Sequence, residues 1–227
     1  MAELKQVVSA HVRLARREDM PHVLALIQQL ADFERLTEMC VATVAKLEAT
    51  LFKQEPLQGP TVLLLELSSS GEHPPISAED SLQKSSSSDK SLQSFLSDLQ
   101  NPHGTGHEII LQSPIKDSHA FAFKSTEDRT IVGFVLFFPN YSTFLAKPGF
   151  YIEDLYVREC YRGQGFGTIL LKSVARLAVA LDYGRVEWCV LDWNVNAIKF
   201  YEGIGAKLLP EWRICRLTGE AMNICGS

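Results

Sequence analysis

A glycine-rich stretch, residues 161–168, carries the clearest chemical signal in this sequence. Arg162 stands directly before glycines at positions 163, 165 and 167, and the stretch lies between an apolar segment that ends at Val157 and a helical pattern that begins near Gly167. Glycines let successive backbone N–H groups approach a phosphate, and a helix N-terminus adds unpaired donors and partial positive charge. This order of strand, glycine loop and helix predicts an anion site, with a ligand-free glycine turn as the alternative.

The glycine spacing separates this site from two common nucleotide sites. A dinucleotide fingerprint needs G-x-G-x-x-G with an acidic residue about 20 positions later, and a P-loop needs G-x-x-x-x-G-K-[ST]. Here the spacing is G-x-G-x-G, and no such lysine follows. Both of these sites are therefore excluded.

Acidic residues form the second chemical signal. Glu153 and Asp154 are neighbours in an apolar segment, residues 150–157. Strict alternation along a strand points the two acids to opposite faces, so we expect them to have separate roles. One face would hold Tyr151, Glu153, Leu155 and Val157, and the other Ile152, Asp154 and Tyr156. Together with Glu34, Asp192 and Glu211 the two acids would attract a cation and raise one another's pKa values, with solvated surface charges as the alternative.

Strand-like and helix-like segments alternate around these residues. Apolar residues at Val23, Leu26, Ile27 and Leu30 form the stripe of a core-facing helix, which Asp19 would cap. Further helices are predicted over residues 44–52, 167–181 and 195–202, the last capped by Asn194. Strands are predicted over residues 12–15, 61–67, 130–138, 150–157, 186–191 and 211–217. This order predicts an α/β or α+β fold built on a mixed sheet.

The composition changes abruptly after Leu67. Twelve serines fall within residues 68–97, and only weak apolar patches follow, at residues 95–99, 109–111 and 120–123. Such a composition cannot offset the entropy lost on ordering. We expect residues 68–129 to be a long, mostly disordered insertion, across which residues 61–67 and 130–138 pair as strands.

Composition and charge narrow the class of protein. The 227 residues include 22 Lys plus Arg and 27 Asp plus Glu, a net charge of −5, so the chain lacks the positive surplus that binds nucleic acid or anionic membrane. Five scattered cysteines without a C-x-x-C pair indicate reduced thiols rather than zinc ligands. The N-terminus is charged throughout and no apolar run approaches ~18 residues, so we expect a cytoplasmic protein without a membrane segment, the nucleus being the alternative location.

Two blocks of the sequence together resemble the GNAT superfamily of acetyl-CoA-dependent N-acetyltransferases. R-G-x-G-x-G at residues 162–167 is similar to the pyrophosphate-binding motif of that superfamily, and residues 193–206 read W-N-x-x-A-x-x-F-Y-x-x-x-G-A. The resemblance covers residues 12–67 and 130–217. It implies one GNAT domain, with a central mixed, mostly antiparallel twisted sheet flanked by helices and with the insertion outside the core.

Within the superfamily the chain is most similar to the diamine and polyamine N-acetyltransferases, especially the plant branch that acts on ornithine and short diamines. The likeness is carried by ADFER at residues 31–35, FYIEDLYV at 150–157 and EWR at 211–213. It implies that Glu34 contacts the distal amine of the substrate and that Phe33, the aromatic residue before it, belongs to the substrate site. It also implies that Glu153, Asp154 and Glu211 supply further acids around the substrate.

Acetyl transfer to an amine needs a neutral nucleophile, a polarised thioester carbonyl and a proton for the departing thiolate. We expect Glu153 to bind the substrate ammonium and take its proton through water, because a carboxylate near its ordinary pKa of ~4.3 is a poor base for an amine. Asp154 would shape the acidic pocket or hold the strand. The resemblance implies that Tyr201 protonates the thiolate, a transfer that is uphill by only ~1.5 pKa units, and a core tyrosine is the alternative.

The resemblance also implies which residues contact acetyl-CoA, with main-chain groups of residues 155–157 and Asn194 serving the pantetheine arm. The expected cofactor-binding residues are Leu155, Tyr156, Val157, Arg162, Gly163, Gln164, Gly165, Phe166, Gly167, Thr168, Asn194, Ala197 and Tyr201. The expected substrate-binding residues are Phe33, Glu34, Glu153, Asp154, Asp192 and Glu211. No metal is expected.

These observations predict an N-acetyltransferase that moves acetyl from acetyl-CoA to a primary amine of a small diamine or basic amino acid, by direct attack in a ternary complex. Ornithine, 1,3-diaminopropane, putrescine and polyamines are the expected substrates, and the resemblance implies a homodimer. Two alternatives stay open: an enzyme that acetylates protein N-termini or lysines, and a non-catalytic acetyl-CoA-binding scaffold. The acid cluster favours a small cation over a peptide, and Glu153 with Tyr201 favours an enzyme over a scaffold.

Overall fold

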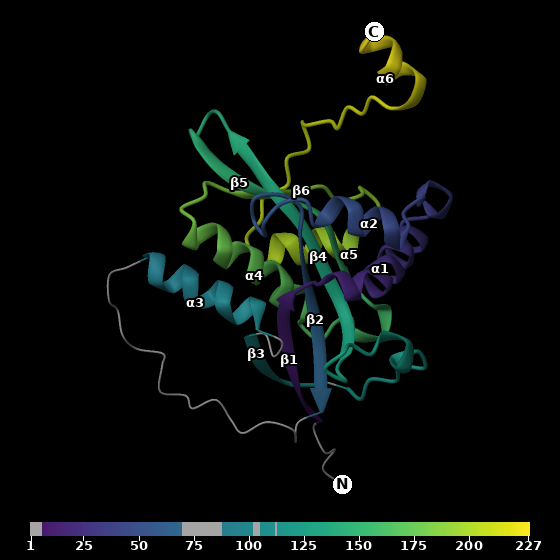
Figure 1. Cartoon of the computed structure of the whole chain (residues 1–227), viewed down its shortest axis with the longest axis vertical. Helices are drawn as coiled ribbons and strands as arrows, with labels where there is room; N and C mark the ends of the chain where they lie inside the picture. The colour runs from purple at the N-terminus through teal and green to yellow at the C-terminus, as the bar shows by residue number, and fades with distance from the viewer. Residues whose placement is uncertain (1–5, 70–87, 102–104, 112) are drawn as a thin grey trace. The chain divides into compact units, whose positions relative to one another are not determined.

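Six strands form one sheet in the computed structural model, which describes residues 6–69, 88–101, 105–111 and 113–227 (Figure 1). The strand order is β3-β1-β2-β4-β5-β6, and every neighbouring pair is antiparallel except β5 and β6, which run parallel. The strands are β1 (Val7–Leu14), β2 (Thr61–Ser69), β3 (Thr105–Ile110), β4 (Thr130–Ser142), β5 (Lys147–Val157) and β6 (Val186–Trp188). The predicted mixed, mostly antiparallel sheet is confirmed.

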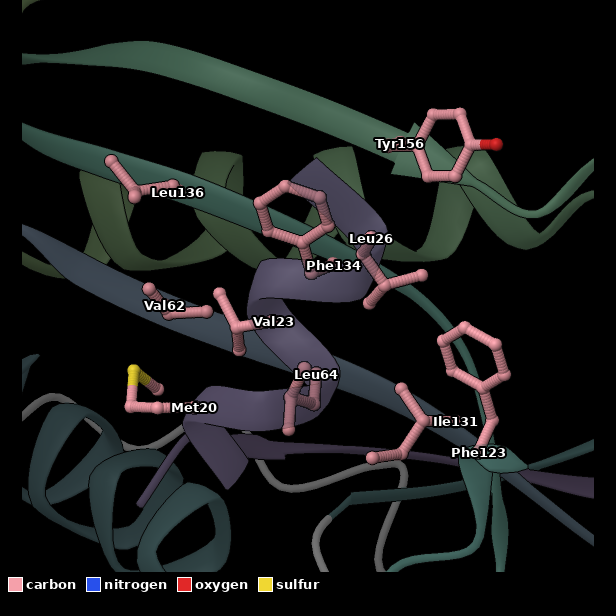
Figure 2. Close-up of a cluster of buried hydrophobic side chains, with 10 residues drawn as sticks. All are labelled: Met20, Val23, Leu26, Val62, Leu64, Phe123, Ile131, Phe134, Leu136 and Tyr156. Atoms are coloured by element: carbon pink, nitrogen blue, oxygen red, sulfur yellow. The ribbon is translucent and has the colours of Figure 1, made fainter. Parts of the chain in front are cut away.

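Helices flank this sheet, with α1 on one face and α4 on the other (Figure 2). The α-helices are α1 (Met20–Phe33), α2 (Val44–Leu51), α3 (Ser88–Gln100), α4 (Phe166–Ala180), α5 (Val195–Gly203) and α6 (Gly219–Cys225). Short 3-10 turns are η1 (Arg17–Asp19), η2 (Thr37–Met39), η4 (Ala120–Phe123) and η5 (Glu159–Tyr161). The chain divides into two compact units, Met1–Trp188 and Cys189–Ser227. None of the described helices combines the length and the apolar composition that crossing a membrane requires.

The core on the α1 face forms because the predicted apolar stripe of this helix meets the β-branched and aromatic side chains of the central strands. Met20, Val23 and Leu26 are fully buried there. Figure 2 shows these three side chains among those of β2 and β4, with Tyr156 of β5 at the edge of the cluster. Burying each such aliphatic side chain stabilises the fold by roughly 1.5–3 kcal/mol.

A buried ion network joins β1, β2 and the turn that precedes α1. The guanidinium of Arg13 donates to the Asp19 carboxylate at 2.7 and 2.9 Å and to Glu66 Oε1 at 2.6 and 3.0 Å. Arg129 is the last residue before β4, and its Nη1 lies 3.8 Å from Oε2 of Glu66. Burial alone would lower the pKa of Arg13, but the bonds to Asp19 and Glu66 raise it above its ordinary value, so the guanidinium stays charged.

Part of the predicted insertion is ordered, which corrects the expectation for residues 88–101, 105–111 and 113–129. Helix α3 buries Phe95 and Leu99, whose spacing of four residues places them on one face of the helix. Strand β3 pairs antiparallel with β1, from Val7 opposite Ile110 to Val12 opposite Thr105. The weak apolar patches at residues 95–99 and 109–111 are therefore sufficient to anchor these elements on β1. Residues 70–87, where serines are dense, lie outside the described residues.

Three other local predictions need correction. Residues 211–217 form no strand, and every one of them is exposed. Strand β6 ends at Trp188, three residues earlier than predicted. Asp19 stands at the N-cap position of α1 but makes no side-chain cap bond, because its carboxylate is engaged by Arg13 and by the backbone N–H of Arg16. The other predicted helices and strands form, and Leu67 pairs with Thr130 across the insertion as expected.

Replacing Arg13 tests the weight of the ion network. In Arg13→Met, Asp19 and Glu66 lose their main cation while buried, so the free energy of unfolding should fall by about 3–5 kcal/mol. Urea unfolding followed by circular dichroism measures this change. The matched control is Lys147→Met, which removes an exposed pair with Asp182 and should cost less than about 1 kcal/mol. Equal losses in the two variants would contradict the role given to the network.

Candidate functional site

The glycine loop has the backbone conformation that its sequence predicts. Gly163 and Gly165 have φ values of +75° and +87°, in the left-handed region that residues with a Cβ adopt at a cost. Gly165 is the N-cap of α4, and a Cβ on either glycine would meet nothing within 4 Å. The loop surface is therefore open, so the first N–H groups of α4 and of the loop are accessible to an anion.

The edge of β5 next to this loop is only partly paired. Strand β6 pairs with β5 over three residues, from Phe150 to Ile152. In the part of the chain that the structure describes, no strand pairs with this edge at residues 153–157. Unpaired backbone groups on a strand edge can bond an extended ligand, and the predicted pantetheine contacts Leu155, Tyr156 and Val157 lie in this stretch. The Val157 carbonyl also accepts a bond from Arg162 Nε at 2.9 Å.

A bulge in β5 corrects the predicted distribution of side chains. Asp154 lies opposite Leu136, and Ile152 lies opposite Phe137, so Glu153 is an extra residue between two ordinary pairs. Residues paired across strands share a face. Because Leu136 and Phe137 face opposite sides, Ile152 and Asp154 do as well, although strict alternation placed them together. Asp154 lies on the α1 face with Tyr156.

The bulge collects acids near the end of α1. Burial, together with the nearby charges of Glu153 and Glu34, raises the pKa of Asp154 to about 6. Glu34, which is the C-cap residue of α1, also has a raised pKa because it is partly buried. The structure therefore brings together three of the five predicted acids, and one of them changes its charge close to neutral pH.

Arg162 connects this acidic region to the glycine loop. Its guanidinium carbon lies 4.5 Å from the ring centre of Phe33 and 5.2 Å from that of Tyr156, within cation–π range. The Tyr156 hydroxyl lies 3.4 Å from Oε1 of Gln29, which is on the same face of α1 as Phe33. Phe33, predicted to meet the substrate, is thus held beside the loop by a cation that the motif supplies.

A cavity of about 630 Å³ opens between α1 and the end of β5. Phe33, Tyr156 and Arg162 line it, and so do residues 116–119. The sequence-based prediction missed these last four residues, because they lie in the segment predicted to be disordered. Its only signal there was the short apolar patch at residues 120–123, which forms η4 and buries Phe123.

Five predicted site residues belong to the second unit, and their roles stay predictions. Asn194 caps α5 as predicted, because its side-chain oxygen accepts a bond from the backbone N–H of Ala197 at 3.2 Å. Tyr201 lies in the same helix, with its ring 5.2 Å from that of Phe200. Asp192 precedes α5, and Glu211 lies in the segment that forms no strand. Among the described residues, no group of three His, Cys, Asp or Glu side chains is arranged to hold a metal ion.

Comparison with known proteins gives independent information. Residues 90–206 match the model of the acetyltransferase (GNAT) family. The chain is 47% identical over 214 residues to L-ornithine N5-acetyltransferase NATA1 of Arabidopsis thaliana, covering 94% of this chain and 86% of that protein. It is 32% identical over 229 residues to tyramine N-feruloyltransferase 4/11 of Nicotiana tabacum, covering 97% and 92%.

A solved structure supports the fold. An aminoglycoside acetyltransferase from an uncultured soil metagenomic sample, meta-AAC0020, superposes with a TM-score of 0.55 at 14% identity, covering 93% of this chain and 97% of that chain. At this identity the likeness concerns the fold alone.

The raised pKa of Asp154 predicts how stability depends on pH. An unfolded Asp titrates near ~3.9 and the folded one near 6, so the folded state binds this proton more tightly. The contribution of this tighter proton binding by Asp154 to the free energy of unfolding is fully present below about pH 4 and is lost as the pH rises through 6. Asp154→Asn should therefore be more stable than the wild type at pH 8, by up to about 3 kcal/mol, and this difference should vanish towards pH 4.

Urea unfolding across this pH range measures the effect. Asp182→Asn is the matched control, because the Asp182 side chain is 87% exposed, and its difference from the wild type should not change with pH in this way. A constant difference between Asp154→Asn and the wild type would contradict the buried, acid-crowded environment of Asp154.

Proposed function

The chain belongs to the GNAT acetyltransferase family and is an enzyme, and from this we propose that it transfers acetyl from acetyl-CoA to a primary amine of a small diamine or basic amino acid. Ornithine is the first candidate acceptor, because the relative that shares 47% of its residues is named for acetylation of ornithine at N5. 1,3-Diaminopropane, putrescine and polyamines are further candidates.

One observation carries the proposal: the acids expected to bind the amine and the loop expected to bind acetyl-CoA lie next to each other, on β5 and directly after it. The acids at the bulge, Glu153 and Asp154, would face a cationic amine, and the open glycine loop follows within ten residues. Between them, residues 153–157 leave one strand edge without a strand partner in the described chain. An amine held by the acids and a thioester held along this edge would meet on one strand, as direct attack requires.

Acetyl-CoA fits the groups that the structure offers. The N–H groups of Gly163, Gly165 and the first turn of α4 would hold its pyrophosphate, with Arg162 adding charge. When bound, acetyl-CoA supplies the acetyl group as an activated thioester. Backbone groups of Leu155 and Val157 would hold and orient its pantetheine arm.

The acids would prepare the amine. At neutral pH a primary amine is protonated, so one proton must leave before nitrogen can attack the carbonyl carbon. Glu153 would receive that proton through water, and Asp154, whose pKa is raised to about 6 by burial and by neighbouring acids, is a second acceptor of suitable strength. Glu34 would hold the distal ammonium group. As the carbon–sulfur bond breaks, Tyr201 would donate its phenolic proton to the sulfur, and the second proton that the nitrogen loses on becoming an amide would return to the Tyr201 phenolate through water.

The predicted homodimer and cytoplasmic location belong to this proposal as well. Apolar side chains stay exposed in the C-terminal part of the second unit, including Leu209, Trp212 and Ile214. Exposed apolar side chains gathered in one segment are typical of protein–protein contacts. They support an assembly of two copies.

The proposal predicts turnover confined to small amines. Thiol release from acetyl-CoA by the purified protein would be measured with ornithine, 1,3-diaminopropane, putrescine, spermidine, lysine, tyramine and a basic peptide. We expect ornithine or a short diamine to have the highest kcat/KM. Turnover of the peptide alone would favour the protein acetyltransferase, and acetyl-CoA binding without turnover of any acceptor would favour the scaffold.

The Tyr201 hydroxyl should matter for the chemical step only. Tyr201→Phe should lower kcat by about 100-fold, because general acid catalysis contributes at least that factor, while the KM for acetyl-CoA stays near the wild-type value. Tyr141→Phe on β4 is the matched control, since that side chain is 59% exposed, and it should leave both constants unchanged. A wild-type kcat in Tyr201→Phe would remove the proposed proton donor.

A further inference from the structure

The segment of residues 113–123 is attached to the turn that carries the glycine loop. Asp117 forms a bidentate ion pair with Arg158, in which both N–O distances are 2.8 Å. Its Oδ2 also accepts a hydrogen bond from the Tyr161 hydroxyl at 2.8 Å. The side chains of Asp117 and Arg158 are only 6% and 4% exposed. Arg158 and Tyr161 bracket the η5 turn, which leads directly into the loop.

Aromatic contacts complete this attachment. The Arg158 guanidinium lies 3.8 Å from the ring centre of Phe123 and 5.4 Å from that of Tyr161. The Tyr161 ring in turn meets Phe166, the first residue of α4, edge to face at 6.2 Å. A chain of contacts therefore runs from Asp117 through Tyr161 to the first turn of the helix that follows the glycines.

A second bond reaches the loop itself. Gln164, between the two glycines of left-handed conformation, donates its Nε2 to the Ser113 hydroxyl at 3.1 Å. The two attachments start from Ser113 and Asp117, four residues apart on the segment. They end at Gln164 and Arg158, six residues apart on the other side. Glycine has no side chain with which to fix its own conformation, so the conformation of the loop depends on the residues beside Gly163 and Gly165.

The charge state of Asp117 suits this role. Burial alone would raise its pKa, but bonds from Arg158, Tyr161 and the backbone N–H of His119 lower the pKa below the ordinary value. Burial and the bond to Asp117 raise the pKa of Tyr161, so its hydroxyl remains a donor. Charge-assisted bonds of this kind are shorter and about twice as strong as neutral ones.

We propose that Asp117 is a positioning residue: through Arg158 and Tyr161 it holds the loop of residues 161–167 in the conformation that binds the pyrophosphate of acetyl-CoA. The inference rests on the proposed function, because that assigns the ligand of the loop. The carboxylate of Asp117 is engaged by Arg158, by Tyr161 and by the backbone N–H of His119, so the proposal gives it no direct contact with either cosubstrate. Its effect should therefore appear as affinity for the CoA moiety, whereas the amine and the chemical step depend on the acids of β5.

The test compares Asp117→Asn with Asp128→Asn. Asp128 pairs with Lys124 at 3.0 Å just beyond the same segment, and its side chain is 87% exposed, so the control makes the same chemical change in an ion pair at the surface. Calorimetric titration with CoA should show about 10-fold weaker binding in Asp117→Asn and wild-type binding in Asp128→Asn. The KM for acetyl-CoA should rise in parallel, with kcat and the KM for the amine nearly unchanged.

Amide hydrogen exchange separates positioning from general loss of structure. In Asp117→Asn, exchange should quicken at residues 158–167 and stay at the wild-type rate in β1, β2 and β4. Wild-type affinity for CoA in this variant would overturn the proposal. So would faster exchange across the whole sheet in both Asp117→Asn and Tyr161→Phe, since their effect would then be structural.

Tyr161→Phe keeps the ring and removes one bond, so it decides the question if Asp117→Asn fails to fold. It should show a smaller loss of CoA affinity than Asp117→Asn, and no loss in a folded Tyr161→Phe protein would overturn the proposal. If the wild type itself does not bind CoA, the proposed function fails. Faster exchange confined to residues 158–167 in Asp117→Asn would then still support the attachment, but not the ligand.

Discussion

Strand β5 pairs with two neighbours of very different length, and the candidate site depends on this mismatch. β4 follows it along almost its whole course, whereas β6 pairs with three residues and then ends. The bulge at Glu153 begins just where that second partner is lost. Because a bulge changes which side chains share a face, Ile152 lies on the face opposite Asp154, and Asp154 shares the α1 face with Tyr156. A regular β5 with a full partner on each side would offer no strand edge beside the glycine loop to an extended ligand.

The repeating parts of the fold could be predicted from the sequence, because periodicity reports directly on burial. The stripe at Val23, Leu26, Ile27 and Leu30 predicted α1, and the uninterrupted apolar runs predicted β2, β4 and β5. The glycine loop was predictable for a similar reason, since few other residues adopt its φ values. These signals are local, and each needs only its own stretch of chain.

What the sequence could not show depends on partners distant in the chain. The bulge follows from a shift in register against β4, and nothing in residues 150–157 marks it. Asp117 stands in a polar, serine-rich context, and its importance comes from Arg158, 41 residues later. Residues 211–217 were predicted as a strand, but a strand also needs a neighbour, and none pairs with them in the described chain. Composition likewise underestimated residues 95–99, because a few apolar side chains are enough when β1 and α4 offer a prepared surface.

The pairing of Leu67 with Thr130 has a consequence for how this family can vary. Residues 68–129, which are 62 residues long, connect these two residues. The pairing holds the two ends of this connection one strand spacing apart, at ~4.8 Å, and this distance does not depend on the length of the connection. The entropy of closing a flexible loop grows only logarithmically, by about 0.6 kcal/mol for each doubling. Relatives could therefore gain or lose tens of residues at this point without disturbing β5. Residues 113–123, which contact the glycine loop and the turn before it, are the exception, and the length of this segment should be conserved.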